Sequence, residues 1–147
     1  MQSIINTIQR YKTLYSGRIS ALPIVILMPH SACNCKCVMC DIWKGNHNLN
    51  QLSEQDIGGL LNTLKRFKTQ VVVMSGGEAL MNKSFFTLCE ILKSENINIS
   101  LLSTGLLLKK NAATLVKWVD DIIGYLDGNE EIQEKVRNIS GALNIMK

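Results

Sequence analysis

The chain alternates between short apolar runs and longer segments in which apolar residues recur every three or four positions. Four short segments rich in Val, Ile and Leu have the length of buried strands; they cover residues 24–28, 71–74, 97–102 and 122–126. Helical spacing occurs before the first strand and after each of them; it covers residues 3–16, 53–64, 83–95, 109–119 and a segment that starts near residue 130. Ser53 and Asp56 have the spacing of a capping box at the start of the second helix. The pattern predicts alternating strands and helices.

Chemically distinctive residues follow each predicted strand at the point where it ends. A cluster of cysteines follows the first strand, and the other three are followed by Gly76-Gly77-Glu78, Ser103-Thr104-Gly105 and Asp127-Gly128. Strand–helix alternation with connections of this length favours parallel β–α–β units with right-handed crossovers. Ligands in such folds bind at the carboxyl ends of the strands. We therefore expect an α/β fold that carries a functional site at this edge of its sheet.

Composition and charge exclude several classes of protein. Apolar residues make up 46% of the 147 residues and charged residues 19%, which indicates a packed globular core. The longest unbroken apolar run, residues 21–28, is far shorter than the roughly 20 residues of a bilayer span, so we expect no membrane span. The net charge of +4 arises in residues 1–40, which is consistent with a solvated helix. No basic run is interleaved with aromatic residues, so we expect no nucleic-acid partner.

Cysteine usage is the strongest chemical signal. Four of the five cysteines lie within eight residues: Cys33, Cys35, Cys37 and Cys40. So tight a cluster is a poor disulfide framework; it indicates a metal or iron–sulfur site in a reducing compartment, and we expect a cytoplasmic protein. Structural zinc sites usually combine two separated pairs of ligands, whereas an iron–sulfur cluster accepts cysteines from one short loop. If three of these cysteines bind a four-iron cluster, one iron stays open to a substrate or cofactor.

The cysteine loop and the three later strand ends together resemble the radical S-adenosylmethionine (radical SAM) superfamily. The loop contains C-x3-C-x2-C at Cys33, Cys37 and Cys40, and Asp41-Ile42-Trp43 follows it. Gly76-Gly77-Glu78 matches the GGE motif of the family. Ser103-Thr104-Gly105 resembles its T-N-G, and Asp127-Gly128 with the later Arg137 resembles its fourth strand exit. The resemblance spans roughly residues 20–147.

The resemblance implies a fold and a domain organisation. The family core is a partial (β/α)6 barrel with parallel strands, and about four of the six expected βα units are recognisable here. The chain is therefore interpreted as a C-terminally truncated core at residues 20–147, preceded by an amphipathic helix at residues 1–19. A sheet that stops at the fourth strand leaves an open edge and apolar surface, so we expect a partner chain or an oligomer to cover it.

The resemblance also implies a set of binding residues. The [4Fe–4S] cluster would be held by Cys33, Cys37 and Cys40, and its open iron would chelate the amino and carboxylate groups of S-adenosylmethionine. Met39 would pack near the adenine. The methionine ammonium would meet backbone groups of Gly76, Gly77 and Glu78, with Ser103 and Thr104 also in contact with the cofactor.

The implied activity is a radical reaction. A one-electron reductant such as flavodoxin or ferredoxin would reduce the cluster, which cleaves S-adenosylmethionine to methionine and a 5′-deoxyadenosyl radical. That radical would abstract hydrogen from a small-molecule or peptide substrate that the sequence does not identify. Two alternatives stay open at this point: a truncated or split chain that binds an iron–sulfur cluster without turnover, and a zinc-binding interaction module.

Other residues either depart from the family pattern or are expected to have structural roles. Cys35 stands where the family commonly has an aliphatic residue, and it is interpreted as a bystander thiol or else an alternative ligand. Tyr125 occupies a position that is usually Ser in the family. Cys89 lies on an apolar helix face, which predicts core packing. His30 and His47 flank the cysteines and are expected to be solvated loop residues.

Overall fold

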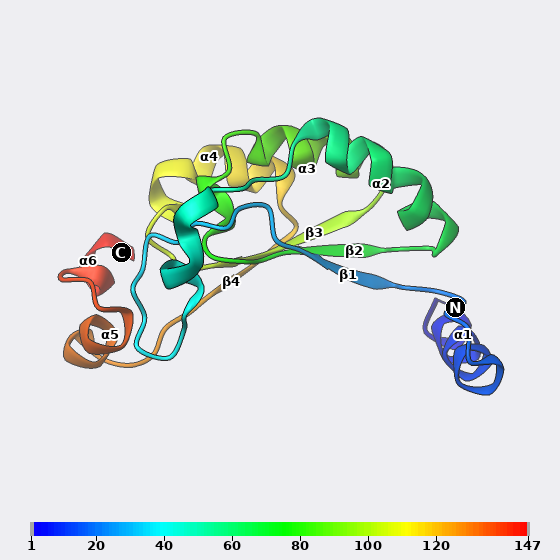
Figure 1. Cartoon of the computed structure of the whole chain (residues 1–147), viewed down its shortest axis with the longest axis horizontal. Coiled ribbons are helices and arrows are strands. Elements are labelled where there is room, and N and C mark those ends of the chain that lie inside the picture. The colour runs from blue at the N-terminus through cyan, green and yellow to red at the C-terminus, as the bar shows by residue number, and fades with distance from the viewer. Residues whose placement is uncertain (1, 147) are drawn as a thin grey trace.

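A computed structural model describes the backbone of residues 2–146 and the side chains of residues 4–45 and 49–145. It contains one parallel sheet in which sequence neighbours are also spatial neighbours (Figure 1). The strands are β1 (Ile24–Leu27), β2 (Val71–Met74), β3 (Asn98–Ser103) and β4 (Asp121–Gly124). The pairings place Ile24 opposite Val71, Val71 opposite Asn98 and Ser100 opposite Asp121. The predicted α/β fold with four parallel strands is thereby confirmed.

Three helices cover one face of the sheet in Figure 1: α2 (Glu54–Arg66), α3 (Phe85–Ser94) and α4 (Leu108–Trp118). Each presents apolar residues to the strands at intervals of three or four, which is why the sequence pattern predicted them. The core between these layers includes Ile57, Leu64, Val72, Met74, Phe85, Leu88, Leu92, Ile99, Leu101 and Leu115. Helix α2 starts with the predicted capping box, in which Asp56 N donates to Ser53 Oγ over 3.2 Å and Ser53 N donates to Asp56 Oδ2 over 2.8 Å.

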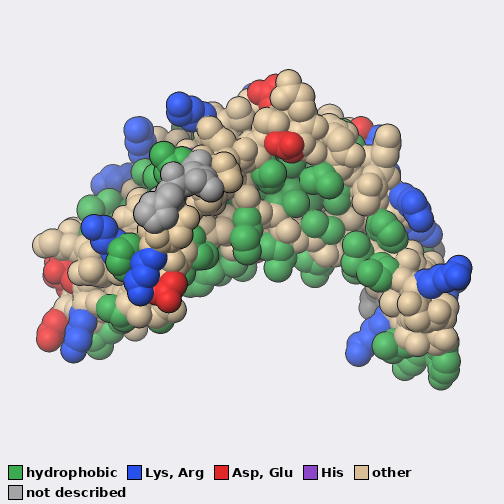
Figure 2. All heavy atoms as spheres, in the orientation of Figure 1, with side chains coloured by type: hydrophobic (Ala, Val, Ile, Leu, Met, Phe, Trp, Pro, Cys, Tyr) green, Lys and Arg blue, Asp and Glu red, His purple; other side chains and the backbone are tan. Residues whose placement is uncertain are grey.

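The opposite face of the sheet has no helical layer. Figure 2 shows hydrophobic side chains gathered along this concave underside. Successive residues of a strand point to opposite faces, so in β1 the residues Val25 and Leu27 pack against the core while Ile24 and Ile26 are exposed. A sheet built from β–α–β units normally has both faces covered, so this surface is incomplete as it stands in the described chain.

The remaining elements lie at the two ends of the sheet. Helix α1 (Gln2–Ser16) is at the amino end of β1, apart from the helical layer, and α5 (Glu130–Arg137) and α6 (Ala142–Met146) follow β4 (Figure 1). Two 3-10 helices, η1 (Ile42–Asn48) and η2 (Ala79–Met81), follow the cysteine loop and the GGE turn. The sequence pattern predicted neither of these short helices nor α6. Among the described residues, no helix has both the length and the apolar composition needed to cross a bilayer.

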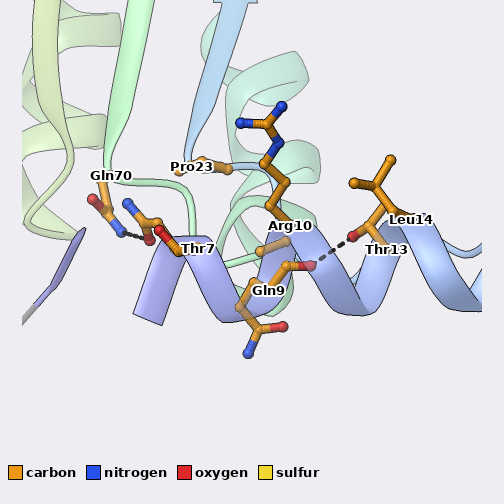
Figure 3. Close-up of a pocket in the computed structure, with 9 residues that line it drawn as sticks. Thr7, Gln9, Arg10, Thr13, Leu14, Pro23 and Gln70 are labelled. Atoms are coloured by element: carbon orange, nitrogen blue, oxygen red, sulfur yellow. Dashed lines mark hydrogen bonds between the residues drawn. The ribbon is translucent and has the colours of Figure 1, made fainter. Parts of the chain in front are cut away.

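A groove of about 710 Å³ lies between α1 and the segments that lead into β1 and β2. Its lining combines polar side chains with Leu14, Ala21 and Pro23, and Gln70 Nε2 donates to Asn6 Oδ1 over 3.2 Å (Figure 3). Gln70 and Pro23 precede the strands, so the groove is at the amino ends of β1 and β2. It is therefore separate from the carboxyl ends, where the cysteines lie.

Candidate functional site

The cysteine loop follows β1 and is held by two neighbouring parts of the chain and by a bond of its own. Ala32 O accepts a hydrogen bond from Glu78 N over 2.9 Å, and Val38 N donates to Val136 O over 3.0 Å. The turn between the second and third cysteines of the motif is closed by Cys40 N, which donates to Cys37 O over 3.3 Å. These bonds fix the loop between the GGE turn and the last turn of α5.

The four thiols of the loop differ in their exposure. Cys35 and Cys37 are buried, whereas Cys33 and Cys40 are partly exposed. A hydrogen bond from the Cys35 thiol lowers the pKa of Cys33 to about 6, outweighing the opposing effect of burial, and the same bond raises the pKa of Cys35. Cys35 N also approaches Cys33 Sγ at 3.4 Å. The thiolate is the form of cysteine that binds iron, and the contact with Cys35 favours that form at Cys33.

The backbone of the GGE turn packs directly against the backbone of the cysteine loop. A Cβ atom at Gly77 would lie 2.1 Å from Ala32 O and 3.0 Å from Cys33 N, so only glycine fits there. Gly76 has φ +109°, a conformation that L side chains rarely adopt, and a Cβ there would lie 3.1 Å from His30 O. The two glycines thus bring the carboxyl end of β2 into contact with the residues that precede Cys33.

The Glu78 side chain is fully buried and joins the ends of β2 and β3. Its carboxylate accepts hydrogen bonds from Thr104 Oγ1 at 2.6 Å, Thr104 N at 2.8 Å and Ser103 Oγ at 3.0 Å, and from Leu80 N at 3.2 Å. Thr104 Oγ1 also lies 3.1 Å from Asn34 Oδ1, which extends the network to the cysteine loop. The Ser103 and Thr104 hydroxyls therefore donate to Glu78, an arrangement that sequence reasoning did not foresee.

Replacing Glu78 by Gln is expected to lower the free energy of unfolding by about 2 kcal/mol. The amide nitrogen would face donors from Ser103 or Thr104, and a buried donor without an acceptor costs about 1–3 kcal/mol. Urea unfolding monitored by circular dichroism measures the change. Glu90→Gln is the matched control because Glu90 is exposed on α3. Equal stability of the two variants would contradict the role assigned to the buried carboxylate.

Arg137 is a charged residue in contact with one of the motif thiols. It is 7% exposed, and its guanidinium forms a bidentate pair with Asp127, with Nε at 2.5 Å from Oδ2 and Nη2 at 2.8 Å from Oδ1. Its Nη1 lies 3.7 Å from Cys37 Sγ, and the Tyr125 ring centroid lies 5.2 Å from the guanidinium carbon. Burial opposes the charge, yet hydrogen bonds to Asp127 and Cys37 raise the pKa of Arg137 above its ordinary value. The guanidinium thus stays charged beside a motif sulfur.

Two of the structural expectations have clear outcomes. Cys89 is buried in the core, as predicted, and burial raises its pKa to about 12. The prediction that His30 is solvated is wrong: it is 8% exposed, and its Nδ1 accepts a hydrogen bond from Ala32 N over 2.7 Å. His30 therefore stabilises the entry to the cysteine loop. The His47 side chain lies outside the described residues.

Most of the predicted site residues lie together at the carboxyl ends of the strands, and Met39 is the exception. The cysteine loop, the GGE turn, Ser103 and Thr104 adjoin one another through the contacts above. Met39 is 62% exposed and does not contribute to the core. A pocket of about 420 Å³ borders this region and includes Gly76, Gly77, His30 and Ser31 in its lining. The Ser31 hydroxyl is buried there without a hydrogen-bond partner among the described residues.

The cysteine loop offers thiols of the kind that bind an iron–sulfur cluster. Among the side chains that the structure describes, no three His, Cys, Asp or Glu residues are placed to share one ion. In a [4Fe–4S] cluster each cysteine binds a different iron, so the thiols must surround a larger body. Cys33, Cys37 and Cys40 lie in one short loop, and the backbone contact at Gly77 places a turn beside them.

Comparisons with known proteins identify the family of this chain. A family model, the Radical SAM superfamily, matches residues 27–143. The chain is 29% identical over 125 residues to an Fe-coproporphyrin III synthase from Methanosarcina barkeri, covering 83% of this chain and 31% of the relative. It is 30% identical over 118 residues to a probable GTP 3′,8-cyclase from Methanococcus maripaludis, covering 78% of this chain and 40% of the relative. The chain thus spans about a third of the length of these curated relatives.

Solved structures show the same fold. SuiB of Streptococcus suis bound to the precursor peptide SuiA superposes with a TM-score of 0.73 at 16% identity, covering 89% of this chain and 30% of SuiB. SuiB bound to S-adenosylmethionine superposes with a TM-score of 0.69 at 15% identity, covering 90% of this chain and 32% of SuiB. With the family match over residues 27–143, the chain belongs to the radical SAM superfamily, whose members use a [4Fe–4S] cluster and S-adenosylmethionine.

Proposed function

We propose that this chain holds a [4Fe–4S] cluster on Cys33, Cys37 and Cys40 and binds S-adenosylmethionine beside it at the carboxyl ends of the strands. The observation that carries the proposal is the packing of Gly77 on Ala32, because it joins the GGE turn to the loop that bears the cysteines. A reduced cluster bound at these cysteines would supply the electron for cleavage of S-adenosylmethionine to methionine and a 5′-deoxyadenosyl radical, which would abstract hydrogen from a substrate.

The other residues of the site bind and orient the cofactor in this proposal. Backbone groups of Gly76, Gly77 and Glu78 meet the methionine ammonium, and Met39 packs near the adenine. Ser103 and Thr104 donate their hydroxyl protons to Glu78. Their contact with the cofactor therefore uses hydroxyl lone pairs or backbone carbonyls, while their bonds to Glu78 keep the ends of β2 and β3 in register.

We propose a peptide as the substrate class and a flavodoxin or ferredoxin as the reductant. SuiB, which shares the fold, is described as bound to a precursor peptide. A low-potential one-electron carrier is needed because the cluster acts by transferring single electrons. The cysteine loop also requires a reducing compartment, so we assign the protein to the cytoplasm.

The domain organisation follows from the same proposal. Residues 20–147 form the radical SAM core, and the helix within residues 1–19 is an addition at the amino end of β1. The helix-free face of the sheet exposes Ile24, Ile26 and Ile123. We propose that a partner chain or an oligomer contact covers this face and the open edge at β4, since apolar surface of this extent is rarely left in water.

Detection of 5′-deoxyadenosine tests the proposed function. The chain is reconstituted with iron and sulfide without oxygen, reduced with dithionite and incubated with S-adenosylmethionine, and the products are quantified by mass spectrometry. We expect methionine and 5′-deoxyadenosine from the wild type and neither from Cys37→Ala. A cluster-loaded wild type that forms neither product would overturn the proposal in favour of a chain that binds the cluster without turnover.

A further inference from the structure

The contact between Arg137 and Cys37 joins residues that are one hundred positions apart in the chain. Arg137 ends helix α5, and that helix lies against the cysteine loop through two backbone bonds. Val38 N donates to Val136 O over 3.0 Å, and Lys36 N donates to Arg137 O over 3.3 Å. These bonds flank Cys37 on both sides. The backbone of α5 thus places the guanidinium beside the Cys37 sulfur.

We propose that Arg137 is a positioning residue that acts through its contact with Cys37 and raises the reduction potential of the cluster. This inference rests on the proposed function, since it requires Cys37 to bind iron. The donor Nη1 is 3.7 Å from Cys37 Sγ, which is within range for an N–H···S hydrogen bond. Hydrogen bonds to cluster sulfurs, net charge and burial are the factors through which a protein sets the potential of an iron–sulfur cluster.

The sign of the effect follows from charge. Reduction adds one electron to the cluster, and a buried positive charge next to a ligand sulfur stabilises the more negative, reduced form. Burial strengthens this interaction because the site has a lower effective dielectric than water. Asp127 opposes it with a negative charge, but its bidentate bonds to Nε and Nη2 leave Nη1 directed at the sulfur. Asp127 therefore fixes the guanidinium and moderates its effect.

The charge of Arg137 can be removed without breaking the bonds that hold the cysteine loop to α5. The bonds that hold the loop to α5 come from the backbone of Arg137 and Val136, so a change of the Arg137 side chain leaves them in place. Arg137→Gln removes the charge, whereas Arg137→Lys keeps it without the planar fork. Arg18→Gln is the matched control, because Arg18 is exposed beyond the end of α1 and the net charge changes by the same amount.

The experiment is an EPR-monitored potentiometric titration of the reconstituted full chain without S-adenosylmethionine, with iron and sulfide measured first. For Arg137→Gln we expect the equilibrium constant for reduction to fall about tenfold, which equals about 59 mV for a one-electron couple. Arg137→Lys is expected to retain most of the wild-type potential and Arg18→Gln all of it. A fully loaded Arg137→Gln with the wild-type potential would overturn the inference.

A second variant keeps the inference testable if Arg137→Gln does not fold or load iron. Asp127→Asn removes the opposing negative charge while its side-chain oxygen still accepts from the guanidinium, so the potential is expected to rise. An unchanged or lower potential in Asp127→Asn would count against the inference. A wild type that binds no iron would instead refute the proposed function, so the two failures are distinguishable by iron content alone.

Discussion

Replacing Cys33, Cys37 or Cys40 by alanine is expected to abolish the iron–sulfur cluster, whereas Cys35→Ala retains it. Each ligand thiolate binds its own iron, so the loss of one leaves a cluster that already has an open iron with only two protein ligands. Iron and acid-labile sulfide per chain, measured after anaerobic reconstitution, should fall from about four of each to background. The expected effect is complete loss, the largest of any change considered for this chain.

Cys35→Ala is the matched control because it removes a thiol from the same loop. Cys35 is buried and contacts Cys33, but it lies outside the C-x3-C-x2-C motif, so its thiol is not needed to hold iron in this proposal. Retained iron in Cys35→Ala with loss in the other three confirms the C-x3-C-x2-C assignment. Loss of iron in Cys35→Ala, with retention in any of the three, would show that the ligand set is wrong.

Gly77→Ala is expected to displace the cysteine loop and to lower the free energy of unfolding by about 3 kcal/mol, the upper end of the range for overpacking. The new Cβ would lie 2.1 Å from Ala32 O and 2.6 Å from the Ala32 carbonyl carbon. Both are backbone atoms, so the clash cannot be relieved by rotating a side chain. The resulting shift would also break the bond from Glu78 N to Ala32 O. Urea unfolding measures the stability, and reconstitution measures the iron that the chain retains.

Gly58→Ala provides the control for Gly77→Ala. Gly58 lies within helix α2, and a Cβ there would meet nothing within 4 Å. Because alanine is the better helix former, this variant is expected to gain about 0.5–1 kcal/mol. If Gly77→Ala were as stable as the wild type and loaded a full cluster, the close packing of the GGE turn on the cysteine loop would be refuted.

The fold was predictable because its signals are local. Residues 71–74 were predicted as a strand and form β2 with the same bounds, and the Ser53 capping box is present as expected. Helix α5 begins at Glu130, where the sequence indicated a start. In a parallel sheet with sequential order, strand ends identified one by one necessarily meet at a common edge. The predicted location of the site required no knowledge of side-chain contacts.

The chemistry within the site depends on contacts that no local pattern encodes. The Glu78 carboxylate accepts hydrogen bonds from Ser103 and Thr104, which lie at the end of another strand, and the sequence alone does not predict these bonds. Arg137 reaches Cys37 across one hundred residues of sequence. The position of His30 in a loop predicted a solvated side chain. The side chain is instead buried, and its Nδ1 accepts a hydrogen bond from Ala32 N. These features arise from tertiary packing.

In the proposed function, three cysteines hold the cluster and leave one iron open to S-adenosylmethionine. The most direct test is the EPR spectrum of the reduced, reconstituted chain recorded with and without S-adenosylmethionine. We expect a [4Fe–4S] signal whose shape changes when the cofactor is added, because the amino and carboxylate groups then bind the open iron. A cluster signal that is identical with and without S-adenosylmethionine would contradict it.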